Sequence, residues 1–350
     1  MIAERWRQLT LLSLAELLAL SLWFSANAVL PALVHEWALS DAGGAGLTIS
    51  VQLGFITGTL VAALTNLPDV WPARRLMAAS ALLGAAANAA LALGVDHLGP
   101  ALVLRFVTGL AMAGAYPPAM KIMATWFREG RGLALGILVG ALTVGSATPH
   151  LVRGLTTLPW RGTLLVASAM AVVGAILVQA CVREGPHAFP AARFDLRVAA
   201  GDDDEGGGAL GCWAGGVVSD RWGRTRLTML AMTASGLCAL TIGFTFGGPP
   251  LLTLLVALVW GVTVIADSAQ FSTAMTELAP PAYVGTALTA QTCAGFALTT
   301  LSIWLIPPVA GALGWRWAFA TLAVGPFLGV AAMARLRALP EARRLAGGRR

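Results

Sequence analysis

Ten long apolar stretches run through the sequence and limit what the chain can fold into. Each is close to the roughly 20 residues that an α-helix needs to cross the hydrocarbon core of a bilayer. Of the 350 residues, 57% are hydrophobic and only 11% are charged, and this composition excludes a water-soluble protein. The sequence therefore predicts an all-α membrane protein with spans near residues 9–34, 44–67, 76–95, 98–120, 132–152, 162–182, 227–246, 251–274, 283–306 and 315–334.

Basic residues gather on one side of these predicted spans. If the connections alternate between the two sides of the membrane, 19 of the 23 Lys and Arg residues fall on the same side as both ends of the chain. Because basic loops tend to stay in the cytoplasm, we expect both termini to be cytoplasmic and the protein to lie in the cell inner membrane. The same distribution accounts for the net charge of +6, so no nucleic-acid partner is needed to explain it.

The two halves of the sequence repeat at an offset of about 150 residues. Asp69 and Arg75, before one apolar stretch, match Asp220 and Arg226 before another. The second half has no counterpart of the first span, and its copy begins with the short apolar segment 209–220. We therefore predict ten full transmembrane helices plus one short helical stub. The predicted parts are an N-terminal six-helix lobe at 1–182, a cytoplasmic linker at 183–207 and an incomplete C-terminal lobe at 208–350.

Residues 216–226, with the sequence GVVSDRWGRTR, carry the most informative motif. They resemble the cytoplasmic signature G-x-x-x-D-R-x-G-R of the major facilitator superfamily (MFS) of secondary transporters. The first-half copy resembles it in Asp69 and Arg75 but lacks the central glycine. An Asp at a helix end can interact with the N-terminus of a neighbouring helix and so hold one conformation. The resemblance implies a cytoplasmic gating motif formed by Asp69, Arg75, Gly216, Asp220, Arg221, Gly223 and Arg224.

Further stretches resemble the same superfamily. Residues 105–109, RFVTG, are similar to its fourth helix, in which an intramembrane Arg precedes Gly-rich packing. Residues 21–27 and 145–150 resemble the nitrate/nitrite and cyanate permease branch. The resemblance implies an MFS-type two-lobe helix bundle that moves a solute by alternating access, and it leaves the cargo open.

Polar groups within the predicted spans are candidates for the transport path, because each is costly to place in hydrocarbon. At about 100° per residue, Glu16 and Asn27 share one helix face, and Arg105 and Tyr116 share another. Arg105 could instead bind backbone carbonyls or a neighbouring acid, and Glu16 and Asp267 could form interhelical hydrogen bonds. The resemblance implies that the first, fourth, seventh and tenth helices line the central path and that this chain lacks the seventh and part of the eighth. The candidate substrate or proton residues are Glu16, Asn27, Arg105, Tyr116, Asp267 and Gln270.

The sequence favours a secondary active transporter of a small solute, with an anion as one candidate because Arg105 offers a buried cation. Coupling to a proton or solute gradient is the expected energy source, since no phosphate-binding Gly-rich loop for ATP occurs. We expect no cofactor, no metal site, no enzymatic activity and no nucleic-acid partner, and a monomer in the lipid bilayer. The alternative is a truncated, non-transporting relative or a membrane sensor.

Overall fold

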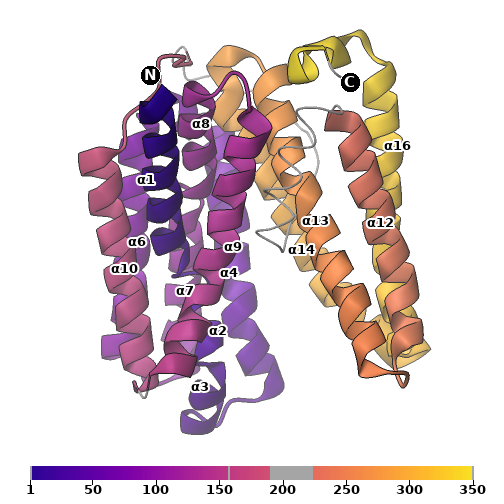
Figure 1. Cartoon of the computed structure of the whole chain (residues 1–350). Helices are drawn as coiled ribbons and strands as arrows, with labels where there is room; N and C mark the ends of the chain where they lie inside the picture. The colour runs from indigo at the N-terminus through magenta and orange to yellow at the C-terminus, as the bar shows by residue number, and fades with distance from the viewer. Residues whose placement is uncertain (1, 157, 190–223, 349–350) are drawn as a thin grey trace. The chain divides into compact units, whose positions relative to one another are not determined.

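The computed structural model describes residues 2–156, 158–189 and 224–348 (Figure 1). In these ranges the chain forms α-helices and short 3₁₀ helices without a β-strand, which confirms the all-α prediction. The motif residues Gly216, Asp220, Arg221 and Gly223 lie outside the described residues, as does the stub expected at 209–220.

The helices follow one another through short connections. In chain order they are α1 (Ile2–Leu20), α2 (Ser25–Ala28), α3 (Leu30–Glu36), α4 (Asp41–Leu64), α5 (Leu67–Val70), α6 (Ala73–Gly94), α7 (Leu98–Met112), α8 (Tyr116–Trp126), α9 (Arg131–Leu155), α10 (Trp160–Cys181), α12 (Arg224–Thr245), α13 (Pro250–Leu278), η1 (Pro281–Tyr283), α14 (Val284–Leu313), α15 (Trp315–Ala318), η2 (Phe319–Ala323), α16 (Val324–Ala338) and η3 (Pro340–Gly348).

Nine segments of the described chain are long and apolar enough to cross a membrane. The predicted first span, which corresponds to α1, α2 and α3, is not among them, so the count of ten full helices stays a prediction. Large apolar side chains on these helices remain exposed, for example Leu93 at 71% and Leu328 at 66%, as a lipid-facing surface requires. The nine segments are Asp41–Leu64, Ala73–Gly94, Leu98–Trp126, Arg131–Leu155, Trp160–Cys181, Arg224–Thr245, Pro250–Leu278, Pro281–Leu313 and Trp315–Ala338.

Two of the predicted spans are interrupted along their length. Residues 21–24 leave the regular helix between α1 and α2, and residues 113–115 do so between α7 and α8. Pro117 and Pro118 follow in the first turn of α8, where their missing N–H groups cost no helical hydrogen bond. Carbonyl groups at such interruptions lack their helical donors, so inside a membrane they need other partners.

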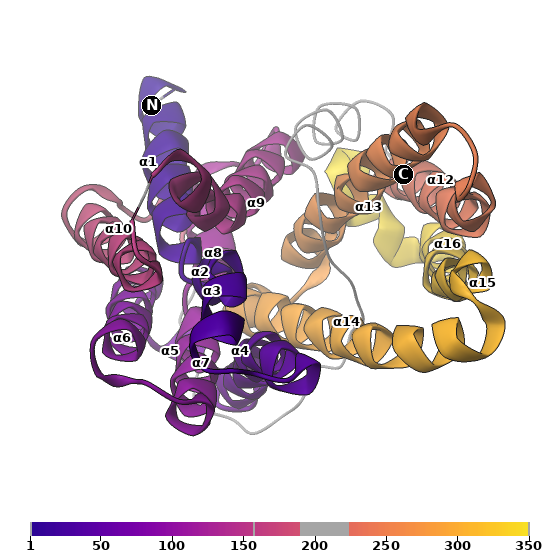
Figure 2. The same cartoon turned by 90° about the horizontal axis from the view of Figure 1, so that it is seen from below.

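The chain divides by its internal contacts into two compact units, which are described separately. Unit 1 comprises Met1–Phe127, Ala141–Asp203 and Pro280–Phe296. Within it α4 packs against α7, and α6 packs against α10, which also contacts α1 (Figures 1 and 2). The first half of α14 therefore belongs to the same unit as the N-terminal helices. Much of the predicted linker at 183–207 lies outside the described residues, and the predicted lobe boundaries stay a prediction.

Glycines bring α4 and α7 into direct backbone contact. A Cβ atom on Gly109 of α7 would overlap the carbonyl oxygen of Val51 on α4. A Cβ atom on Gly54 of α4 would in turn overlap the carbonyl oxygen of Phe106 on α7. Small residues permit this approach, which van der Waals packing then stabilises in a membrane protein.

Unit 2 comprises Arg128–Gly140, Asp204–Ala279 and Ala297–Arg350. In it α12 packs against α13 and α16 (Figure 1). The 3₁₀ helix η3 contacts α13, where Leu345 packs with Ala274. This unit contributes the ends of α12 and α13 that carry the predicted residues Arg224 and Gln270.

Replacing Gly109 by Ala should destabilise unit 1, because the added methyl group would force α7 away from α4. We expect a loss of about 1–3 kcal/mol in the free energy of unfolding, the usual cost of overpacking, measured as a lower Tm in detergent. Gly99→Ala on the same helix is the matched control, since nothing lies within 4 Å of a Cβ atom there. Equal Tm values for the two variants would contradict the close contact.

Candidate functional site

Arg105 lies in α7 and is fully buried, with 0% of its surface exposed. Its Nη1 donates a hydrogen bond to the carbonyl oxygen of Leu22 at 3.2 Å, and its Nη2 donates to that of Trp23. Both carbonyls belong to the interruption between α1 and α2, where the Leu22 carbonyl also accepts from Ser25 Oγ at 2.9 Å and the guanidinium supplies a donor to the Trp23 carbonyl. Of the two structural roles that the sequence left open, Arg105 takes the one in which it binds backbone carbonyls.

The positive charge of Arg105 has no carboxylate partner among the described residues. Its third nitrogen, Nε, also makes no hydrogen bond. Carbonyl oxygens satisfy two of its nitrogen atoms but do not neutralise the charge. A buried, uncompensated cation is expensive in a membrane protein and marks a candidate functional group.

Glu16 lies on α1, and the interruption at residues 21–24 separates it from Asn27 on α2, so the single helix face expected for these two residues is not continuous. Glu16 is 0% exposed, and neither of its carboxylate oxygens has a hydrogen-bond partner in the described part of the chain. The interhelical hydrogen bond that the sequence left open for Glu16 is therefore not observed in the described residues. An unpartnered carboxyl group in the interior of unit 1 is a candidate for binding cargo or a proton.

Three aromatic rings pack together at the interruption that holds Arg105. The Trp23 ring centroid lies 4.9 Å from that of Phe55 on α4 and 4.9 Å from that of Phe296 on α14. The Phe55 and Phe296 centroids are 4.3 Å apart. An apolar wall built from three helices of unit 1 thus adjoins the carbonyls that Arg105 binds.

The other predicted path residues have different surroundings. In unit 1, Asn27 donates from Nδ2 to Thr48 Oγ1 at 3.0 Å, and Tyr116 is the buried first residue of α8. In unit 2, Gln270 is fully buried and accepts a hydrogen bond at Oε1 from Arg224 at 3.3 Å. The side chain of Asp267 lies outside the described residues.

Asp69 connects α5 to the start of α14 within unit 1. Its Oδ1 accepts from the backbone N of Gly285 at 2.9 Å, and its Oδ2 accepts from the backbone N of Thr286 at 2.6 Å. Lys121 of α8 donates to Oδ1 at 2.6 Å and to the carbonyl of Pro68 at 2.9 Å. A carboxylate is favourable at a helix N-terminus, where N–H groups have no helical acceptor. Asp69 thus has the helix-end geometry expected from the motif, and its role in gating stays a prediction.

Arg75 and Arg224 of the predicted gating motif have other surroundings. Arg75 is exposed in the first turn of α6. Arg224 begins α12 in unit 2 and forms a bidentate pair with Glu277 of α13, through Nε to Oε2 at 2.9 Å and Nη2 to Oε1 at 2.7 Å. Such fork-to-fork pairs are among the stronger charge-assisted contacts, so Arg224 joins α12 to α13.

Sequence reasoning missed the partners of these motif residues. Lys121 is the only lysine in the chain, and its position at the end of a predicted span was a usable signal. Glu277 follows Gln270 by seven residues, which puts both on one face of α13. No local pattern indicates that the Leu22 and Trp23 carbonyls bind Arg105, because that contact depends on where α1 is interrupted.

Asp69→Asn should loosen the start of α14, because a neutral amide with one accepting oxygen cannot keep both backbone bonds and the Lys121 ion pair. Breaking a buried pair costs about 3–5 kcal/mol, so we expect a lower Tm and faster hydrogen–deuterium exchange at the amides of Gly285 and Thr286. Asp96→Asn is the control, since Asp96 pairs with Arg161 at the surface with its side chain 82% exposed. Unchanged exchange at the start of α14 would refute the capping role.

Comparisons with known proteins agree with this architecture. The family model of the Major Facilitator Superfamily matches residues 12–195. The proton:xylose symporter XylE bound to 6-bromo-6-deoxy-D-glucose superposes with a TM-score of 0.75 at 12% identity, over 95% of this chain and 95% of that chain. The human organic anion transporter MFSD10 gives a TM-score of 0.73 at 15% identity, over 94% of this chain and 99% of that chain. A search of curated protein sequences gave no match. Because the family model covers more than half of the residues, this multi-pass membrane protein belongs to the major facilitator superfamily.

Proposed function

We propose that the protein is a secondary active transporter that moves a small anion across the cell inner membrane by alternating access. Membership in a transporter superfamily supports transport as the activity. The observation that carries the choice of an anion is Arg105, whose buried charge has no carboxylate partner among the described residues. An anionic solute beside it would neutralise a charge that is otherwise costly inside a membrane.

The interruptions in the helices support a binding site next to Arg105. Transporters commonly bind cargo where spanning helices are broken, because free backbone groups are tolerated only there. Leu22 from the first interruption and Met112, the last residue of α7 before the second, both lie against Gly84 of α6, where a Cβ atom would be 3.0 Å and 2.8 Å from them. The two interruptions share one buried cluster in unit 1, and Arg105, within α7, binds carbonyls of the first.

The similar structures show that this fold serves cargo of different charge. XylE is described as a proton:xylose symporter and MFSD10 as an organic anion transporter. At these identities they support the fold and not the choice of cargo. The resemblance of residues 21–27 and 145–150 to nitrate/nitrite and cyanate permeases makes small inorganic anions the first solutes to test.

Glu16 is the group that we propose for proton coupling. It is fully buried in unit 1 and makes no hydrogen bond with the described residues. A carboxyl group in such a position can bind and release a proton as its access to water changes during transport. The proposed path also includes Asn27, Tyr116, Asp267 and Gln270. Of these, Asn27 donates a hydrogen bond to Thr48.

A second candidate is a non-transporting relative or membrane sensor. It is favoured by the second half of the sequence, which lacks a counterpart of the first span. Ten full spans with a stub, cytoplasmic termini and a monomeric state remain parts of the transporter proposal. Counterflow separates the two functions, because exchange of labelled for unlabelled solute requires a complete transport cycle without any driving gradient.

Arg105→Gln should slow anion exchange strongly, while Arg105→Lys should slow it less. Both variants lose the fork that binds the Leu22 and Trp23 carbonyls, but only Lys keeps the positive charge. Since a hydrogen bond to a charged group contributes about 1.5–3 kcal/mol, we expect exchange by the Gln variant to fall about 10- to 100-fold. The measurement is counterflow of ¹⁵N-nitrite and of cyanate in proteoliposomes, with xylose as the uncharged control solute.

Comparable losses in the Lys and Gln variants at equal Tm would show that Arg105 acts only through the backbone carbonyls. Exchange of xylose without exchange of either anion would contradict the anionic cargo. A wild-type protein that exchanges none of these solutes, and whose Tm none of them raises, would support the non-transporting alternative.

Glu16→Gln should separate solute exchange from proton coupling. The amide is close in size to the carboxyl group but cannot carry a proton between the two sides. We expect counterflow within about threefold of wild type, and loss of the accumulation driven by an imposed pH gradient. Accumulation that still follows the pH gradient in this variant would exclude Glu16 as the coupling residue.

A further inference from the structure

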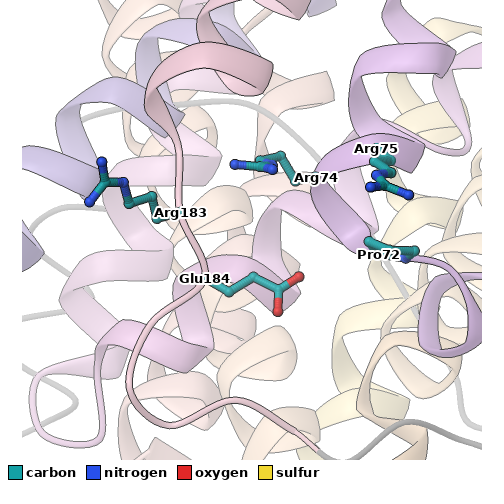
Figure 3. Close-up of a pocket in the computed structure, with 5 residues that line it drawn as sticks. All are labelled: Pro72, Arg74, Arg75, Arg183 and Glu184. Atoms are coloured by element: carbon teal, nitrogen blue, oxygen red, sulfur yellow. The ribbon is translucent and has the colours of Figure 1, made fainter.

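A cavity of about 340 Å³ in unit 1 lies outside the proposed solute path, although Arg75 of the predicted gating motif lines it. It is lined by Pro72, Arg74, Arg75, Arg183 and Glu184 and is called the arginine cavity here (Figure 3). Figure 3 shows Arg74 between Arg75 and Arg183, with Glu184 on the same cavity. Two of the arginines come from the first turn of α6, and the other two charged residues directly follow α10.

The walls of the arginine cavity are held in place by hydrogen bonds. Arg74 donates from Nη1 to the carbonyl of Val182 at 3.2 Å, which joins the start of α6 to the end of α10. The backbone of Arg183 donates from N to Gln8 Oε1 at 2.9 Å and accepts from Trp126 Nε1 at 2.8 Å. Binding to a preformed cavity loses less conformational entropy than binding to a mobile loop.

The charges in the arginine cavity are not balanced. Three arginines and one glutamate leave a net charge of +2. In the described part of the chain, the side chains of Arg75, Arg183 and Glu184 make no hydrogen bond or ion pair, and Arg74 binds only a carbonyl. Basic residues gather at the cytoplasmic ends of membrane helices, and this tendency explains why arginines occur at the start of α6 and just after α10. It does not explain why Arg74 and Arg75 lie side by side on this cavity, while the guanidinium of Arg183, which also lines it, points away from them (Figure 3).

The surroundings of the arginine cavity place it at the level of lipid headgroups. Trp71 and Val70, immediately before Pro72, are 53% and 40% exposed. Exposed tryptophans collect at the boundary between hydrocarbon and water. The distribution of basic residues predicts that this boundary is the cytoplasmic one, where anionic lipids attract arginine clusters.

We propose that the arginine cavity binds the phosphate group of an anionic phospholipid in the leaflet at this end of unit 1. A guanidinium fork matches the geometry of a phosphate and can donate two parallel hydrogen bonds to it. Arg75 provides such a fork beside Arg74, and the phosphate would offset the repulsion between these two arginines. Glu184 weakens the binding of this phosphate, because its negatively charged carboxylate repels it.

The test measures lipid binding to the full-length protein by native mass spectrometry. Delipidated protein is titrated with dioleoyl phosphatidylglycerol, and dioleoyl phosphatidylcholine serves as the headgroup control. Each arginine near an anionic lipid contributes about fivefold in affinity, so Arg74→Gln with Arg75→Gln should weaken the first phosphatidylglycerol site about 25-fold. Arg7→Gln is the matched control, since Arg7 lies at the same end of unit 1, pairs with Glu4 and is outside the cavity.

Glu184→Gln gives a result of the opposite sign, which loss of folding cannot produce. Removing its negative charge should tighten the first phosphatidylglycerol site about fivefold. Equal binding of the two lipids, or equal phosphatidylglycerol binding by wild type and the double variant at equal Tm, would overturn the proposal. Inorganic phosphate that displaces phosphatidylglycerol at equal concentration would also overturn it, because the ligand would then be a soluble anion.

Discussion

A bilayer interior supplies no water to hydrogen-bond free backbone groups, and this constraint governs the centre of unit 1. Where α1 gives way to α2, Ser25 and Arg105 both donate to the carbonyl of Leu22, and the guanidinium of Arg105 donates to that of Trp23. The interruption and the arginine therefore depend on each other. Because carbonyls satisfy hydrogen bonds without cancelling charge, the same residue that stabilises the broken helix retains a positive charge that a solute can neutralise.

Two other buried charges in the described residues, Asp69 and Arg224, differ from Arg105 because each has charged partners. Asp69 is matched by two backbone N–H groups and by Lys121, and Arg224 is matched by both oxygens of Glu277. Each of these pairs joins helix ends, where a change in spacing would break charged hydrogen bonds. Arg105 and Glu16 are exceptions within the part of the chain that the structure describes, since no oppositely charged side chain pairs with either. Unpaired charges inside the bundle and paired charges at helix ends suit a protein that binds in one place and rearranges in another.

Much of this could be read from the sequence, because it depends on local chemistry. The apolar stretches give helices, and their ends fall within a few residues of those observed for α6 and α10. The motif at Asp69 indicated a contact with a helix N-terminus, since a carboxylate in that position has few other uses. The interruptions in the first and fourth spans left only a faint signal, because no proline occurs at 21–24 and the prolines of α8 follow its break.

The sequence by itself determined that the chain crosses a membrane as a set of helices and that charged groups lie among them, because length, hydropathy and charge are properties of each segment alone. Only the tertiary structure decided which groups meet. Arg105 and the Leu22 carbonyl are 83 positions apart, and Asp69 and Gly285 are 216 apart. Arg74 and Arg183 likewise line one cavity only because α6 begins beside the end of α10. Helix packing sets these distances through the small residues at each contact, and no single segment carries that information.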